Sequence, residues 1–165
     1  MTGGHRVWRF GPDIDTDAMA PGAWMQHGVE VIAQHCLESV RAEFPAQVQP
    51  GDVIVAGPNF GIGSSREQAA AALRHLGLAA VIAPSFSGLF FRNAFNLGLL
   101  LLTCPEADRL QEGEPIRFDT RGGSVTRATG ERFAIEPIPA FLLDMVEAGG
   151  LLPQLQRRLQ KRTPE

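Results

Sequence analysis

The residues most able to do chemistry lie at positions 57–67, in the run Gly-Pro-Asn-Phe-Gly-Ile-Gly-Ser-Ser-Arg-Glu. The run follows an apolar, β-branched stretch and precedes a helical pattern. It therefore predicts a strand–loop–helix joint, where α/β proteins usually bind ligands. The first turn of a helix has unpaired N–H groups and the positive end of the helix dipole, so it suits an anion. Arg66 could hold a carboxylate or phosphate through two hydrogen bonds, and Ser64 and Ser65 add hydroxyls.

Gly61 and Gly63 favour an anion site, because neither has a side chain that would keep a ligand away from the backbone N–H groups. The dinucleotide fingerprint needs a small residue where Arg66 stands, and a Walker loop needs Gly-Lys-Ser/Thr. A nucleophile elbow needs a glycine two residues after its serine, which is also absent. By composition alone, an anion site and a plain joint with Ser64 or Ser65 as the helix cap remain equally open.

A second candidate is the run Asp-Ile-Asp-Thr-Asp at positions 13–17. Alternating aspartates resemble the start of an EF-hand. Calcium is not expected, because Ala18 stands where that loop needs glycine and Trp24 stands where it needs glutamate. The run predicts either an Asx-turn loop that orders itself or carboxylates that orient an arginine or a catalytic group.

The histidines and cysteines predict no metal site. The four histidines share no metal-ligand spacing. Two cysteines allow one disulfide at most and cannot supply the four thiolates that normally hold an iron–sulfur cluster. Cys36 is expected to pack on the apolar face of its helix and Cys104 to be buried at the end of a strand.

The elements that position these residues are expected to form one domain. The chain has 165 residues, 44% of them hydrophobic and 20% charged, which is typical of a globular domain. Its net charge of −3 makes nucleic acid or an anionic membrane an unexpected partner. No apolar run reaches signal-peptide length or the ~20 residues of a membrane span. We therefore expect a cytoplasmic protein with reduced thiols.

The first hundred residues alternate predicted strands and helices, as apolar spacing and Gly/Pro breaks indicate. A buried strand before the 57–67 run and another after its helix predict a β-α-β unit with parallel pairing. The expected strands cover 7–10, 52–56, 79–83 and 99–102, and the expected helices cover 29–40, the stretch from the capping serine to 76, and 86–97.

The remaining residues predict a different arrangement. Three short strands separated by Gly-containing turns are expected at 116–118, 124–126 and 132–135, after a helical turn at 106–111. A helix is expected at 140–147, followed by a last, partly exposed helix with leucines on one face. The basic residues of that last helix are expected to be solvated and to complement its dipole.

These runs together resemble the swivel domain of the aconitase superfamily. The resemblance lies in Asp15-Thr-Asp17, in Gly51-Asp-Val-Ile-Val-Ala-Gly57, and in Asn59-Phe-Gly-x-Gly-Ser-Ser-Arg-Glu67. It continues through Ser85-Phe86, Phe91-Arg-Asn93 and Asn96-x-Gly98. The chain length and the ending, Ile138-Pro-x-Phe141 through Glu147-Ala-Gly-Gly150, are similar to the stand-alone small subunits of 3-isopropylmalate dehydratases.

The resemblance implies an α/β fold: a β/β/α swivelling domain with a mixed sheet and flanking helices, formed by residues 1–165. It implies a large-subunit partner that carries a [4Fe–4S] cluster on three cysteines, in a heterodimer or heterotetramer, and no cofactor on this chain. The implied reaction is the dehydration and rehydration of a 2-hydroxy di- or tricarboxylate. In this family 2-isopropylmalate becomes 3-isopropylmalate in leucine biosynthesis, with the cluster iron as the Lewis acid.

The resemblance also implies roles for individual residues. Ser64, as an alkoxide, would be the base that removes a weakly acidic proton beside a carboxylate. The N–H groups of the glycine loop and the helix dipole would stabilise its charge. Asp17 aligns with an active-site aspartate, with an orienting role.

Substrate binding would fall to the neighbouring positions. Ser65 and Arg66 would hold a substrate carboxylate, and the backbone at Gly61 and Gly63 would line the site. Trp24 would form an edge of the pocket.

The chain departs from the family pattern at several positions. Ile62 stands for a cysteine, Gln68 for a histidine, and the loop 20–25 and the run 85–88 each lack an expected arginine. Because the first loop is associated with substrate choice, another diacid of the methylmalate, maleate or homoaconitate type remains open. A non-catalytic subunit whose loop merely captures anions is the third hypothesis.

Overall fold

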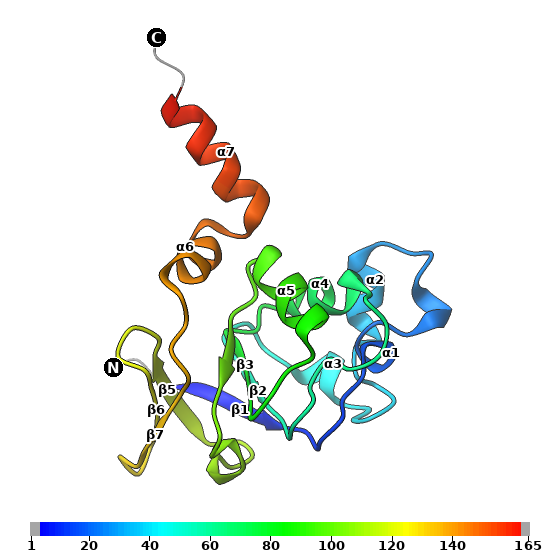
Figure 1. Ribbon diagram of the computed structural model, residues 1–165. Coiled ribbons are helices and arrows are strands. Elements are labelled where there is room, and N and C mark those ends of the chain that lie inside the picture. The colour runs from blue at the N-terminus through cyan, green and yellow to red at the C-terminus, as the bar shows by residue number, and fades with distance from the viewer. Residues whose placement is uncertain (1–3, 163–165) are drawn as a thin grey trace.

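The computed structural model describes residues 4–162, which form a seven-stranded sheet with flanking helices (Figure 1). The strand order is β4-β3-β2-β1-β5-β6-β7. The strands are β1 (His5–Arg9), β2 (Val53–Val55), β3 (Ala80–Ala83), β4 (Leu101–Thr103), β5 (Pro115–Asp119), β6 (Ser124–Arg127) and β7 (Arg132–Ala134). The helices are α1 (Thr16–Met19), α2 (Val29–Gln34), α3 (Phe44–Gln47), α4 (Glu67–His75), α5 (Gly88–Asn96), α6 (Ala140–Ala148) and α7 (Leu151–Arg162), with 3₁₀ turns η1 (Gly22–Trp24) and η2 (Ala107–Arg109).

The four strands β1 to β4 form the parallel half of the sheet. β1 pairs with β2, β2 with β3, and β3 with β4, each in parallel. Every residue of β2 and β3 is buried, which explains their unbroken apolar sequence. The predicted β-α-β unit is confirmed, because α4 connects β2 to its parallel neighbour β3. The carboxyl ends of these strands therefore meet at one edge of the sheet.

Small apolar residues let α4 pack closely on the core. Ala69, Ala70, Ala72 and Leu73 are buried, which repeats the helical spacing of the sequence. Both α2 and α5 pack against α4, and Figure 1 shows the three helices side by side. The start of α4 is therefore held firmly above the edge where the strands end.

The predicted helix over 29–40 is wrong in its second half, because α2 ends at Gln34. Leu37 has a left-handed backbone with a φ of 62°, and its N–H donates to the Ala18 carbonyl at 2.8 Å. This contact with the end of α1 replaces a helical hydrogen bond. Cys36 is buried as predicted, whereas Val40 is 48% exposed rather than part of an apolar face.

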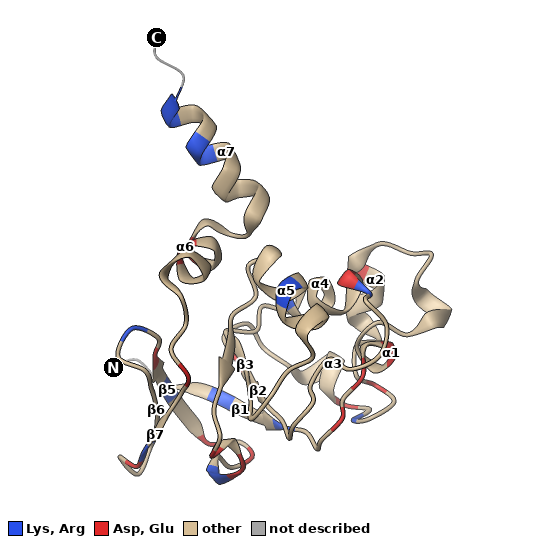
Figure 2. Ribbon diagram, in the orientation of Figure 1, with Lys and Arg blue, Asp and Glu red and all other residues tan. Residues whose placement is uncertain are grey.

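The three short strands predicted in the second part of the chain are present, and the structure shows that they pair antiparallel. β5 pairs with β1 and with β6, and β6 pairs with β7, all antiparallel. α6 and α7 follow, and α7 extends away from the rest of the structure (Figure 1). Its Lys and Arg residues stand out in Figure 2, and its leucines at 152 and 155 are exposed. No helix among residues 4–162 combines the length and apolarity needed to cross a bilayer.

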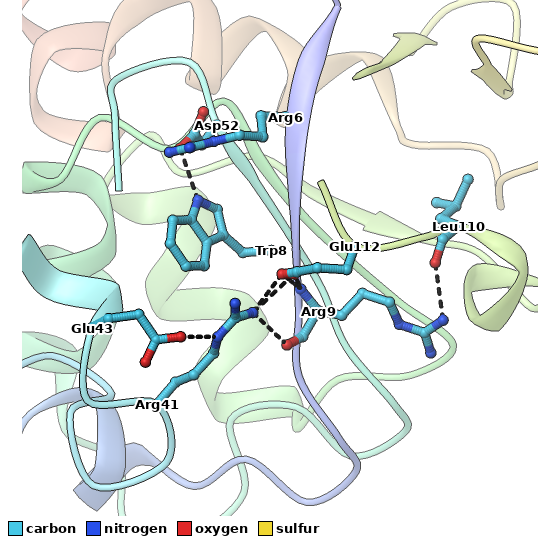
Figure 3. A network of polar contacts seen from close by, with 8 residues as sticks. All are labelled: Arg6, Trp8, Arg9, Arg41, Glu43, Asp52, Leu110 and Glu112. Atoms are coloured by element: carbon cyan, nitrogen blue, oxygen red, sulfur yellow. Dashed lines mark hydrogen bonds and ion pairs between the residues drawn. The ribbon is translucent and has the colours of Figure 1, made fainter. Parts of the chain in front are cut away.

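A buried carboxylate connects the start of β2 to β1 (Figure 3). Asp52 Oδ2 accepts hydrogen bonds from Arg6 at 2.7 Å, from Trp8 Nε1 at 2.8 Å and from the Gln49 N–H at 2.9 Å. Arg41 lies over the Trp8 ring, 4.6 Å from its centroid. Burial raises the pKa of Asp52, but the hydrogen bonds outweigh burial and hold the pKa below its ordinary value.

Candidate functional site

Three loops meet at the carboxyl edge of the parallel strands. The loop after β2, residues 56–66, is bonded to the loop after β1 and to the loop after β3. The Gly61 N–H donates to the Ile14 carbonyl at 2.7 Å, and the Ser87 N–H donates to the Phe60 carbonyl at 2.9 Å. Segments far apart in the sequence are thereby held together around the Gly-x-Gly-Ser-Ser-Arg run.

Ser64 lies on the exposed surface of this loop. Its hydroxyl Oγ is 3.1 Å from Thr16 Oγ1, and its carbonyl oxygen is 3.0 Å from the same Thr16 atom. Thr16 is the first residue of α1 and is only 1% exposed. Gly63 has a φ of 105°, and a Cβ there would stand 3.2 Å from Thr16 Oγ1. Glycine at 63 therefore allows the two loops to approach each other closely.

The predicted serine cap is wrong. The N-cap of α4 is Arg66, with no side-chain hydrogen bond, and the helix begins at Glu67. The Ser64 hydroxyl contacts Thr16 instead. Within residues 4–162 no acceptor is recorded for the backbone N–H groups of residues 63–65, so these donors are open to an anion.

Gly61 and Gly63 differ in what they contribute. The Gly61 N–H is already bonded to Ile14, and a Cβ at Gly61 would overlap the Phe90 side chain. Gly61 therefore shapes the buried side of the loop. Gly63 is exposed and leaves its N–H open at the surface.

Arg66 is held by one end of its guanidinium group. Its Nη1 forms an ion pair with Asp17 Oδ1 at 2.8 Å and donates to the Ala20 carbonyl at 2.9 Å. In the described part of the chain, Nε and Nη2 have no recorded acceptor. These two nitrogens form the planar side of the group that binds a carboxylate through two parallel hydrogen bonds. Arg66 is thus fixed in place and can still receive an anion.

Ser65 is positioned through its backbone. Its carbonyl oxygen accepts a hydrogen bond from Asn93 Nδ2 at 3.2 Å, and Asn93 belongs to α5. Ser65 is an exposed residue, and it lies between Ser64 and Arg66 in the sequence. The structure therefore brings the predicted residues Ser64, Ser65, Arg66 and Asp17 together.

The three aspartates of the run at 13–17 have three different partners. Asp13 Oδ1 accepts a hydrogen bond from Asn59 Nδ2 at 3.0 Å. Asp15 caps α1 by accepting from the Ala18 N–H at 2.8 Å. Only Asp17 faces Arg66, which agrees with an orienting carboxylate.

Trp24 lies apart from these groups, in η1. Its ring stacks on His35, with centroids 3.8 Å apart and planes inclined by 4°. The backbone four residues before it, at Ala20, holds Arg66. Trp24 therefore belongs to a loop that contacts the site, while its ring packs against His35.

Thr16 and Asn93 are two site residues that could not be recognised from the sequence. Both lie inside runs that were recognised, Asp-Thr-Asp and Phe-Arg-Asn, yet neither has a charge or a nucleophile that attracts attention. Their roles appear only in the folded chain, where Thr16 meets Ser64, 48 residues away, and Asn93 meets Ser65, 28 residues away.

The sequence of this chain is similar to those of known proteins. The profile of the aconitase C-terminal domain matches residues 18–107. The 3-isopropylmalate dehydratase small subunit of Thermodesulfovibrio yellowstonii is 42% identical over 157 residues, which cover 93% of this chain and 94% of that protein. The chain belongs to the 3-isopropylmalate dehydratase small-subunit family of the aconitase superfamily.

Structural comparison agrees with this family. The crystal structure of 3-isopropylmalate dehydratase from Methanocaldococcus jannaschii matches with a TM-score of 0.90 and 36% identity, over 97% of this chain and 96% of that one. The predicted mixed-sheet swivel fold is thereby confirmed. The methanogen homoaconitase small subunit of Methanothermobacter thermautotrophicus is also similar, at 43% identity over 150 residues, 89% of this chain and 86% of that protein.

The iron–sulfur cluster implied by the 3-isopropylmalate dehydratase family does not fit the described residues of this chain. Cys36 and Cys104 are both buried, and burial raises the pKa of each thiol above its ordinary value. Buried, protonated thiols are poor metal ligands. Among residues 4–162 no group of three or more His, Cys, Asp or Glu side chains is placed to hold a metal ion.

Two departures from the family pattern lie near the site. The expected arginines are replaced by Ala23 in η1 and Gly88 at the start of α5. Both residues are exposed. Anion binding at this edge therefore depends more on Arg66 and on the open N–H groups of residues 63–65 than it would in a chain that kept both arginines.

Proposed function

We propose that this chain is the small subunit of a hydro-lyase that interconverts 2-isopropylmalate and 3-isopropylmalate and acts together with a large subunit. We take residues 1–165 as one swivel domain. The observation that supports this most strongly is a grouping at one edge of the sheet: the hydroxyl of the exposed residue Ser64, the open side of the Arg66 guanidinium, and the N–H groups of residues 63–65, which have no acceptor among residues 4–162. This grouping can receive a carboxylate and remove a proton next to it.

Ser64 is the base in this proposal. A proton beside a carboxylate is weakly acidic, so its removal needs a strong base that is positioned within hydrogen-bond reach. A serine alkoxide is strong enough, but it forms only where nearby donors stabilise its negative charge. The N–H groups of residues 63–65 and the start of the nine-residue helix α4 can supply that stabilisation.

Arg66 and Ser65 hold the substrate. Nε and Nη2 of Arg66 bind a carboxylate side-on, while Asp17 and the Ala20 carbonyl keep Nη1 from turning. The Ser65 hydroxyl adds a further hydrogen bond. This arrangement orients the substrate so that the proton to be removed faces Ser64.

The metal chemistry of the reaction belongs to the large subunit. We assign the [4Fe–4S] cluster to that partner, because the described residues of this chain offer no set of ligands for it. The small subunit supplies the base and the carboxylate clamp, so neither subunit alone has a complete active site.

The experiment that tests this proposal uses the small subunit coexpressed with its large subunit. Ser64→Ala should lower kcat by about 10²–10⁴-fold, the range that general acid–base catalysis contributes. The two subunits should still copurify, because Ser64 is an exposed residue and the backbone hydrogen bonds that hold its loop remain. Ser39→Ala, at an exposed serine in the turns after α2, is the matched control. Normal turnover by the Ser64 variant would refute the assigned base.

A second candidate is the same reaction on another dicarboxylate. It is favoured by the altered loop 20–25 and by the absence of arginines at positions 23 and 88. A panel of 2-isopropylmalate, 2-methylmalate, maleate and homocitrate, assayed with the assembled enzyme, decides between the two. Exclusive use of 2-isopropylmalate would remove the second candidate. The lack of iron-dependent activity with any large subunit would instead indicate a non-catalytic anion-binding subunit.

A further inference from the structure

We propose that Thr16 is a positioning residue for Ser64 and donates the hydrogen bond that stabilises the Ser64 oxygen when it is deprotonated. Thr16 Oγ1 lies 3.1 Å from Ser64 Oγ and 3.0 Å from the Ser64 carbonyl oxygen. One hydroxyl thus contacts both oxygens of the same residue. The inference rests on the proposed role of Ser64 as the base.

The hydrogens of this pair can be assigned. A carbonyl oxygen only accepts hydrogen bonds, so Thr16 donates its single hydrogen whenever it bonds to the Ser64 carbonyl. The protonated Ser64 hydroxyl then donates to Thr16 Oγ1. When Ser64 is an alkoxide it can only accept, and Thr16 donates to it by a rotation about the Cβ–Oγ1 bond.

Proton transfer balances without ionising Thr16. The Ser64 alkoxide takes the proton from the substrate carbon as the C–H bond breaks, and a new Ser64 O–H bond forms. The C–H electron pair stays on the substrate and forms the C=C bond as the hydroxyl group leaves, and Ser64 becomes an alkoxide again when it returns a proton to carbon in the rehydration step. The Thr16 hydrogen returns to the Ser64 carbonyl, and the new Ser64 hydrogen points to Thr16 Oγ1. The Ser64 carbonyl therefore accepts the Thr16 hydrogen while Ser64 is protonated.

The surrounding structure holds Thr16 in place. Thr16 is buried, with 1% of its surface exposed, and its N–H donates to the Ile62 carbonyl at 2.9 Å. Asp15 caps the helix that Thr16 begins, and Gly63 leaves the space that Thr16 Oγ1 occupies. A fixed donor stabilises a developing charge at little reorganisation cost, whereas water must reorient.

Other charged groups near Ser64 are unchanged by a substitution at Thr16. The charged and titratable side chains on the elements around Ser64 are Asp13, Asp15 and Asp17 before and in α1, Arg66 and Glu67 at the start of α4, Arg74 and His75 at its end, and Arg92 on α5. Asp17 and Arg66 pair with each other, and Asp15 bonds to the Ala18 N–H. A change in the pH profile of a Thr16 variant would therefore report the lost hydroxyl.

The test compares Thr16→Val with Thr16→Ser in the enzyme assembled with its large subunit. Valine keeps the buried shape and removes the donor, so kcat should fall by about 10²–10³-fold, as for the loss of one donor to an oxyanion. KM should stay within about twofold, because Arg66 still binds the carboxylate. The rising limb of kcat against pH should move to higher pH, because the alkoxide has lost a donor. Thr16→Ser should restore both the rate and the profile.

The outcomes separate this inference from the proposed function. An active Ser64→Ala enzyme overturns the base itself. An inactive Ser64→Ala enzyme together with an unaltered Thr16→Val enzyme overturns only the role of Thr16. If Thr16→Val is slow but its pH profile is unshifted, or if Thr16→Ser is as slow as Thr16→Val, then Thr16 has only a structural role. Either result also overturns the positioning role of Thr16. If the valine variant fails to assemble, Thr16→Ala is measured in the same way.

Discussion

Asp17 and Arg66 are paired across the site, with Asp17 Oδ1 2.8 Å from Arg66 Nη1. The two residues are far apart in the sequence, in α1 and just before α4. The ion pair uses only one end of the guanidinium group and leaves the side formed by Nε and Nη2 for a ligand. Asp17 therefore positions Arg66 without occupying the surface that the substrate needs.

Asp17→Asn should weaken substrate binding more than it weakens the fold. Partly exposed ion pairs contribute up to about 1 kcal/mol, so KM should rise by up to about fivefold as Arg66 loses its fixed orientation. The melting temperature should change little. Steady-state kinetics and thermal unfolding of the assembled enzyme measure both quantities. An unchanged KM with a clearly lower melting temperature would show that Asp17 is only structural.

Gly61→Ala should destabilise the subunit strongly. Gly61 has a φ of 87°, and the new Cβ would overlap Phe90, so backbone strain and overpacking add together. Gly130→Ala is the matched control, because its φ is 91° and nothing lies within 4 Å of the new Cβ. The free energy of unfolding from urea titrations should fall by about 1–3 kcal/mol more at Gly61 than at Gly130. Equal losses of unfolding free energy in the two variants would show that the packing of Phe90 against Gly61 does not contribute to stability.

The carboxylate of Asp52 should make stability depend on pH. Folding lowers the pKa of Asp52 below its ordinary value of 3.8, so the carboxylate stabilises the fold above that pH. This contribution is lost as the pH falls through the lower pKa of the folded state. Asp52→Asn should therefore reduce the free energy of unfolding by about 1–3 kcal/mol at pH 7, where it breaks the buried hydrogen bonds.

The difference between Asp52→Asn and the natural protein should begin to shrink below about pH 4, because the carboxyl of the unfolded chain is protonated there, while the folded carboxyl is protonated only at a lower pH. Urea unfolding between pH 3 and pH 7 measures this difference. Asp108→Asn, at an exposed carboxylate, serves as the control and should give a small, flat difference. A difference at Asp52 that stays constant down to pH 3 would contradict the assignment.

Trp24 should affect the choice of substrate more than the rate of the chemistry. Trp24→Ala should change the ratio of kcat/KM for 2-isopropylmalate and 2-methylmalate by about tenfold, the effect of gaining or losing methylene-sized contacts. Trp24→Phe keeps an aromatic ring that can stack on His35 and should change the ratio less. An unaltered ratio in both variants would place Trp24 outside the substrate pocket.

The sequence alone indicated the parallel β-α-β unit and the three short strands after it, because buried β-branched runs and Gly-marked turns are local signals. It also placed Ser64, Ser65 and Arg66 in a loop between a strand and a helix, where the structure has them, while an anion site and a plain joint remained equally open. It failed at the helix over 29–40, where the hydrogen bond from Leu37 to Ala18 ends the helical periodicity. It also failed at the helix cap, because the Ser64 hydroxyl contacts Thr16 instead of the first turn.

The sequence by itself determined which groups are available: a serine pair, one arginine, and glycines that keep the backbone open. Only the tertiary structure decided that Thr16 meets Ser64 and that Asp17 meets Arg66. The physical reason is the parallel pairing of β1 with β2, which places the loops after both strands at the same edge. Hydrogen bonds from the Gly61 N–H to the Ile14 carbonyl at 2.7 Å and from the Asp13 N–H to the Pro58 carbonyl at 2.9 Å then set the relative positions of those loops. No local pattern in either segment encodes that contact.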